Sequence, residues 1–190
     1  MRGRALVLAI VAVASTATPL VAQRRGRIVE VRPFVALSMP MGAQRDAVND
    51  AVTLGLQGAL ELEDGVHLVA SADWSPATAW VPGGSESVDV YQYDLGVELS
   101  RLHPSFLGWA LNPFVGAGIG GRTYDYAART PSGNCSAAYV GGGTELRHQR
   151  TAVRVELRAQ AFCYHVPGGA DEAVTRSDLR FAVGLSHHLR

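Results

Sequence analysis

Apolar and polar residues alternate along residues 151–164 with a period of two. The apolar set is Val153, Val155, Leu157, Ala159 and Ala161, and the polar set is Arg154, Glu156, Arg158 and Gln160. This period places the two sets on opposite faces of a β-strand, whereas a helix would scatter the charges around its circumference. The stretch is also longer than an ordinary strand of about five or six residues. The length of the strand and its buried charges together indicate that it belongs to the wall of a barrel, with lipid on one side and a polar lumen on the other.

The same alternation recurs along the chain and predicts eight strands. They cover about 28–38, 51–62, 66–74, 88–101, 109–122, 136–147, 151–164 and 175–189. Long connections are expected at 39–50, 75–87, 125–135 and 165–174, and short ones between them. Glu63-Asp64-Gly65 predicts a three-residue hairpin that pairs Leu62 with Val66. An even-stranded meander with its long loops at one end is typical of outer-membrane barrels.

Alternation alone does not say which face lies inside, because a soluble barrel of the lipocalin kind has the same period with its faces exchanged. Opposite charges on the polar faces favour the membrane barrel, because they would neutralise one another in a narrow lumen. The acids on these faces are Glu30, Glu61, Asp73, Asp94, Glu98, Glu145, Glu156 and Asp178. The bases are Arg32, Arg122, Arg154, Arg158, Arg176, Arg180 and Arg190.

Glycines and aromatic residues support the same orientation. Gly116, Gly118 and Gly120 share the polar face, where small residues relieve crowding inside a small barrel but would only weaken a solvated strand. Trp74, Tyr91 and Trp109 lie on the apolar face near strand ends, where outer-membrane barrels have an aromatic girdle. Tyr91 and Trp109 are the first apolar residues in the alternating patterns of their strands. We therefore expect an all-β fold, an eight-stranded antiparallel up-and-down transmembrane barrel.

These patterns resemble the small eight-stranded outer-membrane proteins of the OmpA/OmpX type. The resemblance covers residues 28–190 and depends on segments such as 112–120 and 181–186. It implies outer-membrane lipid as the surroundings and the barrel-insertion machinery as a partner during biogenesis. Such proteins usually end in an aromatic residue after an alternating strand, which their insertion machinery recognises. This chain ends in His187-His188-Leu189-Arg190, so it matches that insertion signal only in part.

The amino terminus predicts export. Arg2 and Arg4 precede an apolar run over 5–13, and small residues follow near Ala22. We expect a signal peptide over 1–23 and a barrel domain over 24–190. The run is too short to span a membrane, since spanning needs about 20 apolar residues. The formal net charge of zero provides no basic field for nucleic acid, and we expect a monomer.

Cys135 and Cys163 are the two cysteines, and in an exported chain they predict a disulfide. Pairing Glu145 with Arg154 leaves the cysteines one residue out of register and on opposite faces. A bulge at Gly141-Gly142-Gly143 would restore the register.

Candidate chemistry is sparse. Ser186, His187 and His188 are adjacent, but neighbours in a strand point to opposite faces. No Ser, His and acidic residue occur at a spacing typical of a catalytic triad. The other histidines are too far apart for a metal site. We expect no catalytic, metal or cofactor site. The candidate functional residues are a lumenal charge network of Arg154, Glu156, Arg158, Glu145, Asp94, Glu98, Arg176, Asp178, Arg180 and Arg122.

The sequence thus predicts a non-enzymatic outer-membrane barrel with an envelope-structural or surface-interaction role. Eight strands leave room for side chains only, so we expect no large pore. Two other readings stay open. One is a soluble secreted barrel that binds a small apolar ligand, and the other is a lipid-modifying enzyme of the outer membrane.

Overall fold

The computed structural model describes residues 28–81, 83–101, 108–127, 133–165 and 173–189. The expected signal peptide, the short connection expected at residues 102–107 and Arg190 lie outside these residues. Within them, no helix has the length and apolarity needed to cross a membrane.

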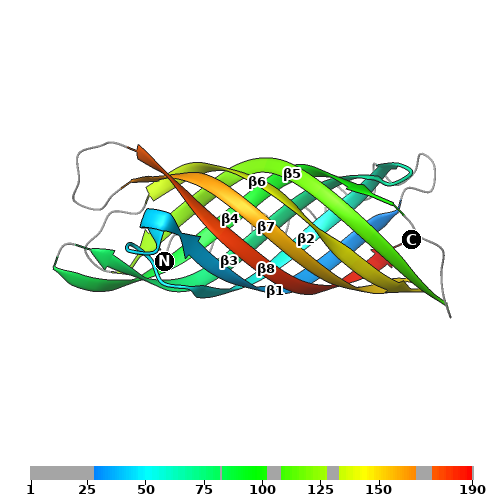
Figure 1. Ribbon diagram of the computed structural model, residues 1–190, viewed down its shortest axis with the longest axis horizontal. Coiled ribbons are helices and arrows are strands. Elements are labelled where there is room, and N and C mark those ends of the chain that lie inside the picture. Colours follow the sequence, from blue (N-terminus) through cyan, green and yellow to red (C-terminus); the bar gives the residue numbers. More distant parts are fainter. Residues whose placement is uncertain (1–27, 82, 102–107, 128–132, 166–172, 190) are drawn as a thin grey trace.

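The described chain forms a closed antiparallel barrel in which each strand pairs with its neighbours in sequence and β8 pairs with β1 (Figure 1). This arrangement confirms the predicted eight-stranded up-and-down barrel. The elements are β1 (Val29–Met41), the short 3-10 helix η1 (Gly42–Gln44), β2 (Ala51–Glu63), β3 (Val66–Val81), β4 (Gly84–Ser100), β5 (Trp109–Tyr126), β6 (Gly133–His148), β7 (Thr151–His165) and β8 (Ala173–Leu189).

The two ends of the barrel differ. We call the end with η1 the loop end, and the end where β1 begins and β8 finishes the turn end, which also holds the tight connections after Glu63 and His148. In outer-membrane barrels short turns are periplasmic and longer connections extracellular.

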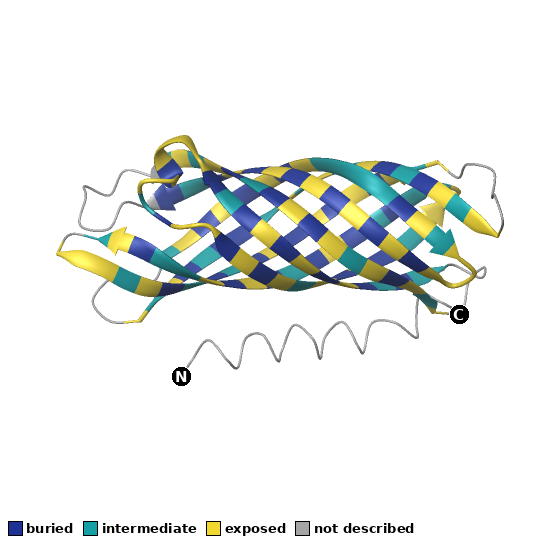
Figure 2. Cartoon of the chain, turned by 60° about the horizontal axis from the view of Figure 1, so that its bottom comes forward, coloured by how far each residue is buried: buried dark blue, intermediate teal, exposed yellow. Residues whose placement is uncertain are grey.

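Charged side chains of the alternating strands point into the barrel and apolar ones point out, so buried and exposed residues form a checkerboard (Figure 2). Val153 and Leu157 are 44 % and 49 % exposed, whereas Arg154 and Arg158 are 4 % and 3 % exposed. A soluble barrel would need the opposite arrangement, with apolar side chains filling the centre. The alternative of a soluble, ligand-binding barrel is therefore wrong for this fold.

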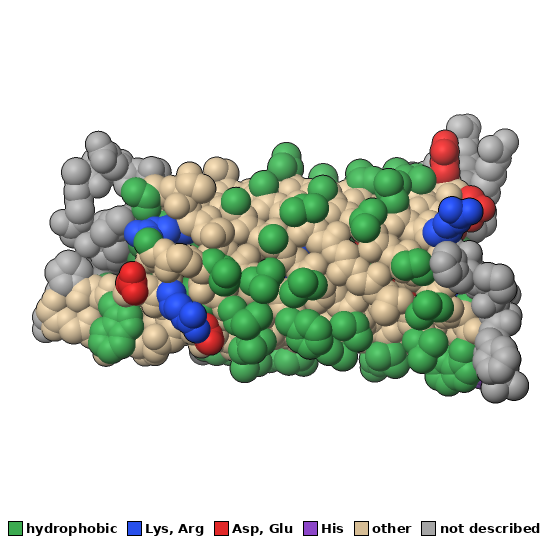
Figure 3. Space-filling view, viewed as in Figure 1, with side chains coloured by type: hydrophobic (Ala, Val, Ile, Leu, Met, Phe, Trp, Pro, Cys, Tyr) green, Lys and Arg blue, Asp and Glu red, His purple; other side chains and the backbone are tan. Residues whose placement is uncertain are grey.

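Exposed apolar side chains occur on all eight strands, and on the face shown in Figure 3 they form a band with charged side chains near its two ends. On β5 the exposed apolar side chains run from Leu111 to Ile119. At about 3.3 Å per residue and a strand tilt near 40°, this segment spans roughly 20 Å along the barrel axis. That height is close to the roughly 25 Å of the lipid-facing band of outer-membrane barrels.

The predicted long loop at 75–87 is wrong, because β3 continues to Val81 and β4 begins at Gly84. The alternation persists there, but its sense is inverted. Ala79, Val88 and Val90 point inward and are buried, whereas polar Ser87 lies on the outer face. Above the lipid the outer face meets water, so apolar residues belong inside, and a search for apolar-out alternation misses the extension.

The inverted region carries its own hydrophobic core. Val48, which follows η1, bridges to Ala79 and packs in a cluster with Val88, Val90, Tyr124, Ala137, Phe162 and Tyr164. We call this cluster the cap. It closes the loop end of the lumen with apolar side chains, whereas the lumen below it is polar.

The turn after β2 differs from the prediction by one residue. Glu63, and not Leu62, pairs with Val66, and the register shifts between Glu61 and Glu63. Leu62 is therefore the extra residue of a bulge, which lets it stay exposed on the lipid side. Gly65 has φ +73, the left-handed conformation expected of glycine in this turn.

Candidate functional site: the charged lumen

The lumen is filled by layers of arginine guanidinium groups; except for Arg176 near the cap, they are held by carboxylates or amides, and several stack on an aromatic ring. Strand alternation places these groups inside, and the antiparallel register brings residues from distant parts of the sequence to one level. Desolvated charges are tolerated in proteins only when they are paired and hydrogen-bonded, so the geometry of each layer determines whether the lumen is stable.

Arg154 of β7 is the centre of the layer at the turn end. Its guanidinium donates to Glu98 Oε2 at 2.5 Å and to Glu145 Oε1 at 2.9 Å, and its Nε lies 3.4 Å from Glu156 Oε2. The guanidinium carbon also lies 3.4 Å from the centroid of the Phe114 ring. Arg154 therefore links β4, β6 and β7 through the interior, in addition to the hydrogen bonds of the sheet.

A second arginine closes this layer from β1. Arg32 donates to Glu30 Oε2 at 2.8 Å and to Glu98 Oε1 at 3.1 Å, and its Nη2 lies 3.8 Å from Glu145 Oε1. Glu98 and Glu145 are thus each shared by Arg32 and Arg154. Each carboxylate has more than one cationic partner, which compensates for its removal from water.

Arg147 is a lumenal residue that the sequence analysis missed. It donates to Glu30 Oε1 at 2.9 Å and to Glu145 Oε2 at 2.7 Å, and it also contacts His188. Its position two residues after Glu145 on the same strand face was the signal that could have identified it.

The middle layer is built around Arg158. Its Nε donates to Glu156 Oε1 at 2.8 Å, its Nη1 lies 3.4 Å from Asp94 Oδ2, and its guanidinium lies 4.1 Å from the centroid of Tyr139. Gln57 donates to Glu156 at 3.3 Å. Sequence reasoning did not single out Gln57, because uncharged amides on a polar face carry no distinctive signal.

The upper layer contains Arg122, which is hydrogen-bonded on several sides. It donates to Asp178 Oδ2 at 2.6 Å and to the side-chain oxygens of Gln92 and Gln160 at 2.8 Å, and it stacks 3.8 Å from the centroid of Phe162. The sequence analysis placed Gln160 on the polar face but included neither glutamine in the charge network.

Arg180 and Arg176 lie on the same face of β8 but differ in their partners. Arg180 donates to both carboxylate oxygens of Asp73, at 2.6 and 3.0 Å. Arg176 forms no ion pair with any described residue, and its guanidinium lies 5.9 Å from the centroid of Tyr164. The structure therefore brings nine of the ten predicted network residues into ion pairs and leaves Arg176 near the cap.

Inward-facing glycines make room for the aromatic rings that stack on these arginines. A Cβ atom added to Gly118 would lie 2.5 Å from Tyr139 Cε1 and 2.6 Å from the backbone oxygen of Leu95. A Cβ atom on Gly143 would lie 2.8 Å from Phe114 Cζ. The lumenal glycines are thus recesses for rings, which is more specific than the general relief of crowding expected from the sequence.

Below the cap lies a cavity of about 30 Å³, bordered by Gln44, Asp178 and Arg180 among others. This volume corresponds to one or two water molecules. Gln44 is buried, and its Oε1 has no hydrogen-bond partner among the described residues. Tyr126 packs against the cap and shares a hydrogen bond with Tyr164 at 3.2 Å, and burial together with this bond raises the pKa of Tyr126.

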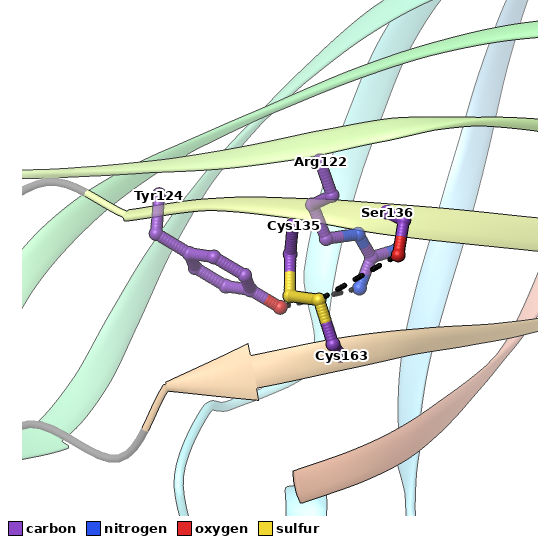
Figure 4. The surroundings of a disulfide bond; sticks show 5 residues. All are labelled: Arg122, Tyr124, Cys135, Ser136 and Cys163. Carbon is purple, nitrogen blue, oxygen red and sulfur yellow. Dashed lines mark hydrogen bonds between the residues drawn. A yellow bond between two sulfur atoms is a disulfide. The ribbon is translucent and has the colours of Figure 1, made fainter. Parts of the chain in front are cut away.

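Cys135 and Cys163 form a disulfide between β6 and β7, with their Cα atoms 5.4 Å apart (Figure 4). Glu145 pairs with Arg154 as expected, but no bulge interrupts the register at Gly141-Gly142-Gly143. The β6–β7 pairing ends at Ala137 and Phe162, just before the cysteines. Beyond that point β6 still pairs with β5 and β7 with β8, but β6 and β7 no longer pair with each other, so the bridge forms between positions one residue apart without a bulge.

Ser186 and His188 point into the lumen, but their contacts do not form a catalytic triad. Ser186 donates to Glu30 Oε2 at 3.0 Å, and His188 contacts the other oxygen of the same carboxylate. The acid therefore lies between the serine and the histidine, whereas nucleophilic catalysis needs the histidine in that place. The described residues also contain no group of three or more His, Cys, Asp or Glu side chains arranged to hold a metal ion.

Comparisons with known proteins agree on the architecture. No family model and no curated protein matches the sequence. Among solved structures, Neisserial surface protein A is similar, with a TM-score of 0.60 and 9 % identity over 84 % of this chain and 96 % of that one. The outer membrane protein OprG of Pseudomonas aeruginosa is similar with a TM-score of 0.55 and 12 % identity, over 86 % and 96 % of the two chains.

The N-terminal β-barrel domain of Pseudomonas aeruginosa OprF is similar as well, with a TM-score of 0.53 and 14 % identity over 85 % of this chain and 97 % of that one. At these identities the likeness concerns the fold, which is that of small eight-stranded outer-membrane barrels.

Proposed function

We propose that this chain, which has the fold of small eight-stranded outer-membrane β-barrels, is a closed, non-enzymatic envelope protein. Its lumen serves as a rigid polar core, and its loop end is the surface that it presents outside the cell. The observation that carries the proposal is the filled lumen, in which paired arginines occupy the interior from Arg154 to Arg122 and the cap covers them.

A filled lumen supports a structural role over transport. Each guanidinium in the path of a solute would have to leave its carboxylate partner, and removing one partner from a buried pair costs about 3 to 5 kcal/mol. Several such layers lie in series, and the apolar cap lies above them. A solute would therefore have to disrupt the interactions that hold the barrel together.

Conductance across planar bilayers tests closure. We expect the full-length chain to give no stable conductance steps, and we expect steps from a variant that combines Arg122→Ala, Arg154→Ala and Arg158→Ala. Co-flotation with vesicles shows that both proteins are inserted. Steady ion flow through the wild-type protein would contradict the proposal, as would a silent triple variant that is inserted.

Cell fractionation tests location. A barrel with a continuous apolar band should remain with outer membranes after a high-salt wash, because salt screens charges but leaves apolar burial intact. Release into the soluble fraction would refute membrane placement. Comparison of envelope lipids with and without the protein tests the enzymatic alternative, and a change in acylation would show that the non-enzymatic assignment is wrong.

The part of the chain best placed to act as a presented surface is the β3–β4 hairpin. It continues past Trp74 and Tyr91 to Val81 and Gly84, beyond the upper end of the apolar band. Trp80 near its tip is 55 % exposed. An envelope-structural or surface-interaction role is therefore favoured over an activity inside the lumen.

A further inference from the structure

The outward face of β5 to β8 carries a row of polar and aromatic side chains at the turn end. Trp109 pairs with His148, His148 with Thr151, and Thr151 with His187, so the four residues lie side by side across the sheet. All four are exposed on the outer face. We call them the rim row.

One step toward the middle of the barrel, the next outward row is entirely apolar. Leu111 pairs with Leu146, Leu146 with Val153, and Val153 with Leu185. Their exposures of 43 to 54 % mark them as lipid-facing. The change from apolar to polar between the two rows places the rim row at the level of the lipid headgroups, where amphipathic rings such as tryptophan are enriched.

The rim row lines a groove with a volume of about 630 Å³, together with Arg150 from the β6–β7 turn. None of the residues that line it is acidic. Among the described residues, the Arg150 side chain has no hydrogen-bond or ion-pair partner. The groove is therefore electropositive, with an apolar wall on its membrane side.

Two imidazole rings are fixed in this groove. His148 stacks on Trp109 with ring centroids 4.9 Å apart, and its Nδ1–H donates to the Gly108 carbonyl oxygen at 3.0 Å. His187 Nδ1 lies 3.3 Å from Thr151 Oγ1. Each contact uses Nδ1, so Nε2 of the neutral His148 ring is an acceptor, and the Arg150 guanidinium is the group that can donate to a phosphate oxygen. An unpaired guanidinium beside oriented rings suits a phosphate oxygen.

We propose that this groove binds the phosphodiester headgroup of a phospholipid from the periplasmic leaflet. Arg150 contacts the phosphate, the rim row positions it, and the acyl chains lie over Leu111, Leu146 and Val153. The occupant is a lipid rather than free phosphate, because the apolar row continues directly from the groove. The inference depends on the proposed membrane placement and adds a defined lipid site to it.

Native mass spectrometry of the detergent-purified full-length chain, mixed with phosphatidylglycerol, tests the site. We expect Arg150→Gln to weaken lipid retention about fivefold, as for one arginine at an anionic lipid surface. Trp109→Leu should weaken it as well. Arg101→Gln is the matched control, because Arg101 is also exposed at the turn end but does not line the groove. Heat-modifiable migration in gels shows that each variant is folded.

Three results would overturn the proposal. Equal loss of lipid in Arg101→Gln and Arg150→Gln would indicate general charge attraction. Full displacement of the lipid by millimolar inorganic phosphate would identify a phosphate site without a lipid. Unchanged lipid retention in Arg150→Gln would show that Arg150 does not contribute to lipid binding. Because these measurements use purified protein, they are separate from the fractionation test of location.

Discussion

Replacing Arg154 by methionine tests whether the ion-paired lumen holds the barrel together. Methionine keeps much of the side-chain volume and can still cover the Phe114 ring, so the change removes mainly the charge. Glu98, Glu145 and Glu156 each lose one partner. Each retains another, because Arg32 contacts Glu98, Arg147 contacts Glu145 and Arg158 contacts Glu156.

The magnitude follows from this redundancy. Removing one partner of a buried pair costs about 3 to 5 kcal/mol, and the remaining partners place Arg154→Met near the lower limit, at about 3 kcal/mol. Glu98→Gln should cost about 2 kcal/mol by the same reasoning. The double variant restores the charge balance, so we expect a total loss of about 2 kcal/mol, well below additivity.

Urea unfolding from lipid vesicles, followed by tryptophan fluorescence, measures these free energies. Arg101→Met serves as the control for loss of an exposed arginine and should change the free energy of unfolding by less than about 0.5 kcal/mol. If the two single losses simply add in the double variant, Arg154 and Glu98 are not coupled. A loss below about 1 kcal/mol for Arg154→Met would show that the lumenal pairs do not stabilise the barrel.

Three further predictions concern the backbone and the disulfide. Gly118→Ala should destabilise the barrel by about 1 to 3 kcal/mol, because the added Cβ meets the Tyr139 ring and the backbone. Gly58→Ala has open space and should be neutral or stabilising. Equal effects of the two substitutions in urea unfolding would show that Gly118 is not needed to make room for the ring. Gln149 has φ +54, so Gln149→Gly should raise the free energy of unfolding by about 1 kcal/mol, and a loss in the same assay would show that no strain is present. The Cys135–Cys163 bridge encloses a separation of 28 residues, so its reduction should lower stability by about 3 to 4 kcal/mol; alkylation of either cysteine without reductant would show that the bridge is absent.

The membrane-spanning part of the fold could be predicted from the sequence because lipid and lumen impose opposite demands on alternate residues. The charge of Arg154, Glu156 and Arg158 against Val153, Val155 and Leu157 is enough to define the strand and its inner face. What the sequence could not provide was the height of the barrel. Where β3 and β4 leave the lipid, water replaces hydrocarbon outside, and the alternation reverses its sense around Ala79 and Val88.

The lumenal site was predictable as a set of residues, but of its pairs the sequence predicted only Glu145 with Arg154, which face each other across a short turn. Parity assigns each residue to a face, whereas the pairing of Arg122 with Asp178 or of Arg180 with Asp73 depends on the closure of the barrel. Arg147 was accessible to the same parity argument. Gln44 was not, because it follows a strand and becomes buried only when η1 folds over the loop end.

The inverted core above the lipid gives the β3–β4 hairpin a support of its own. From Trp74 to Val81 the strand rises about 20 Å, held from within by Val48, Val88 and Val90. The surface exposed here is therefore that of an ordered β-hairpin with a fixed conformation. Antibodies against this hairpin should recognise a conformational epitope. A synthetic peptide with the sequence of residues 75–87 should therefore compete poorly for them.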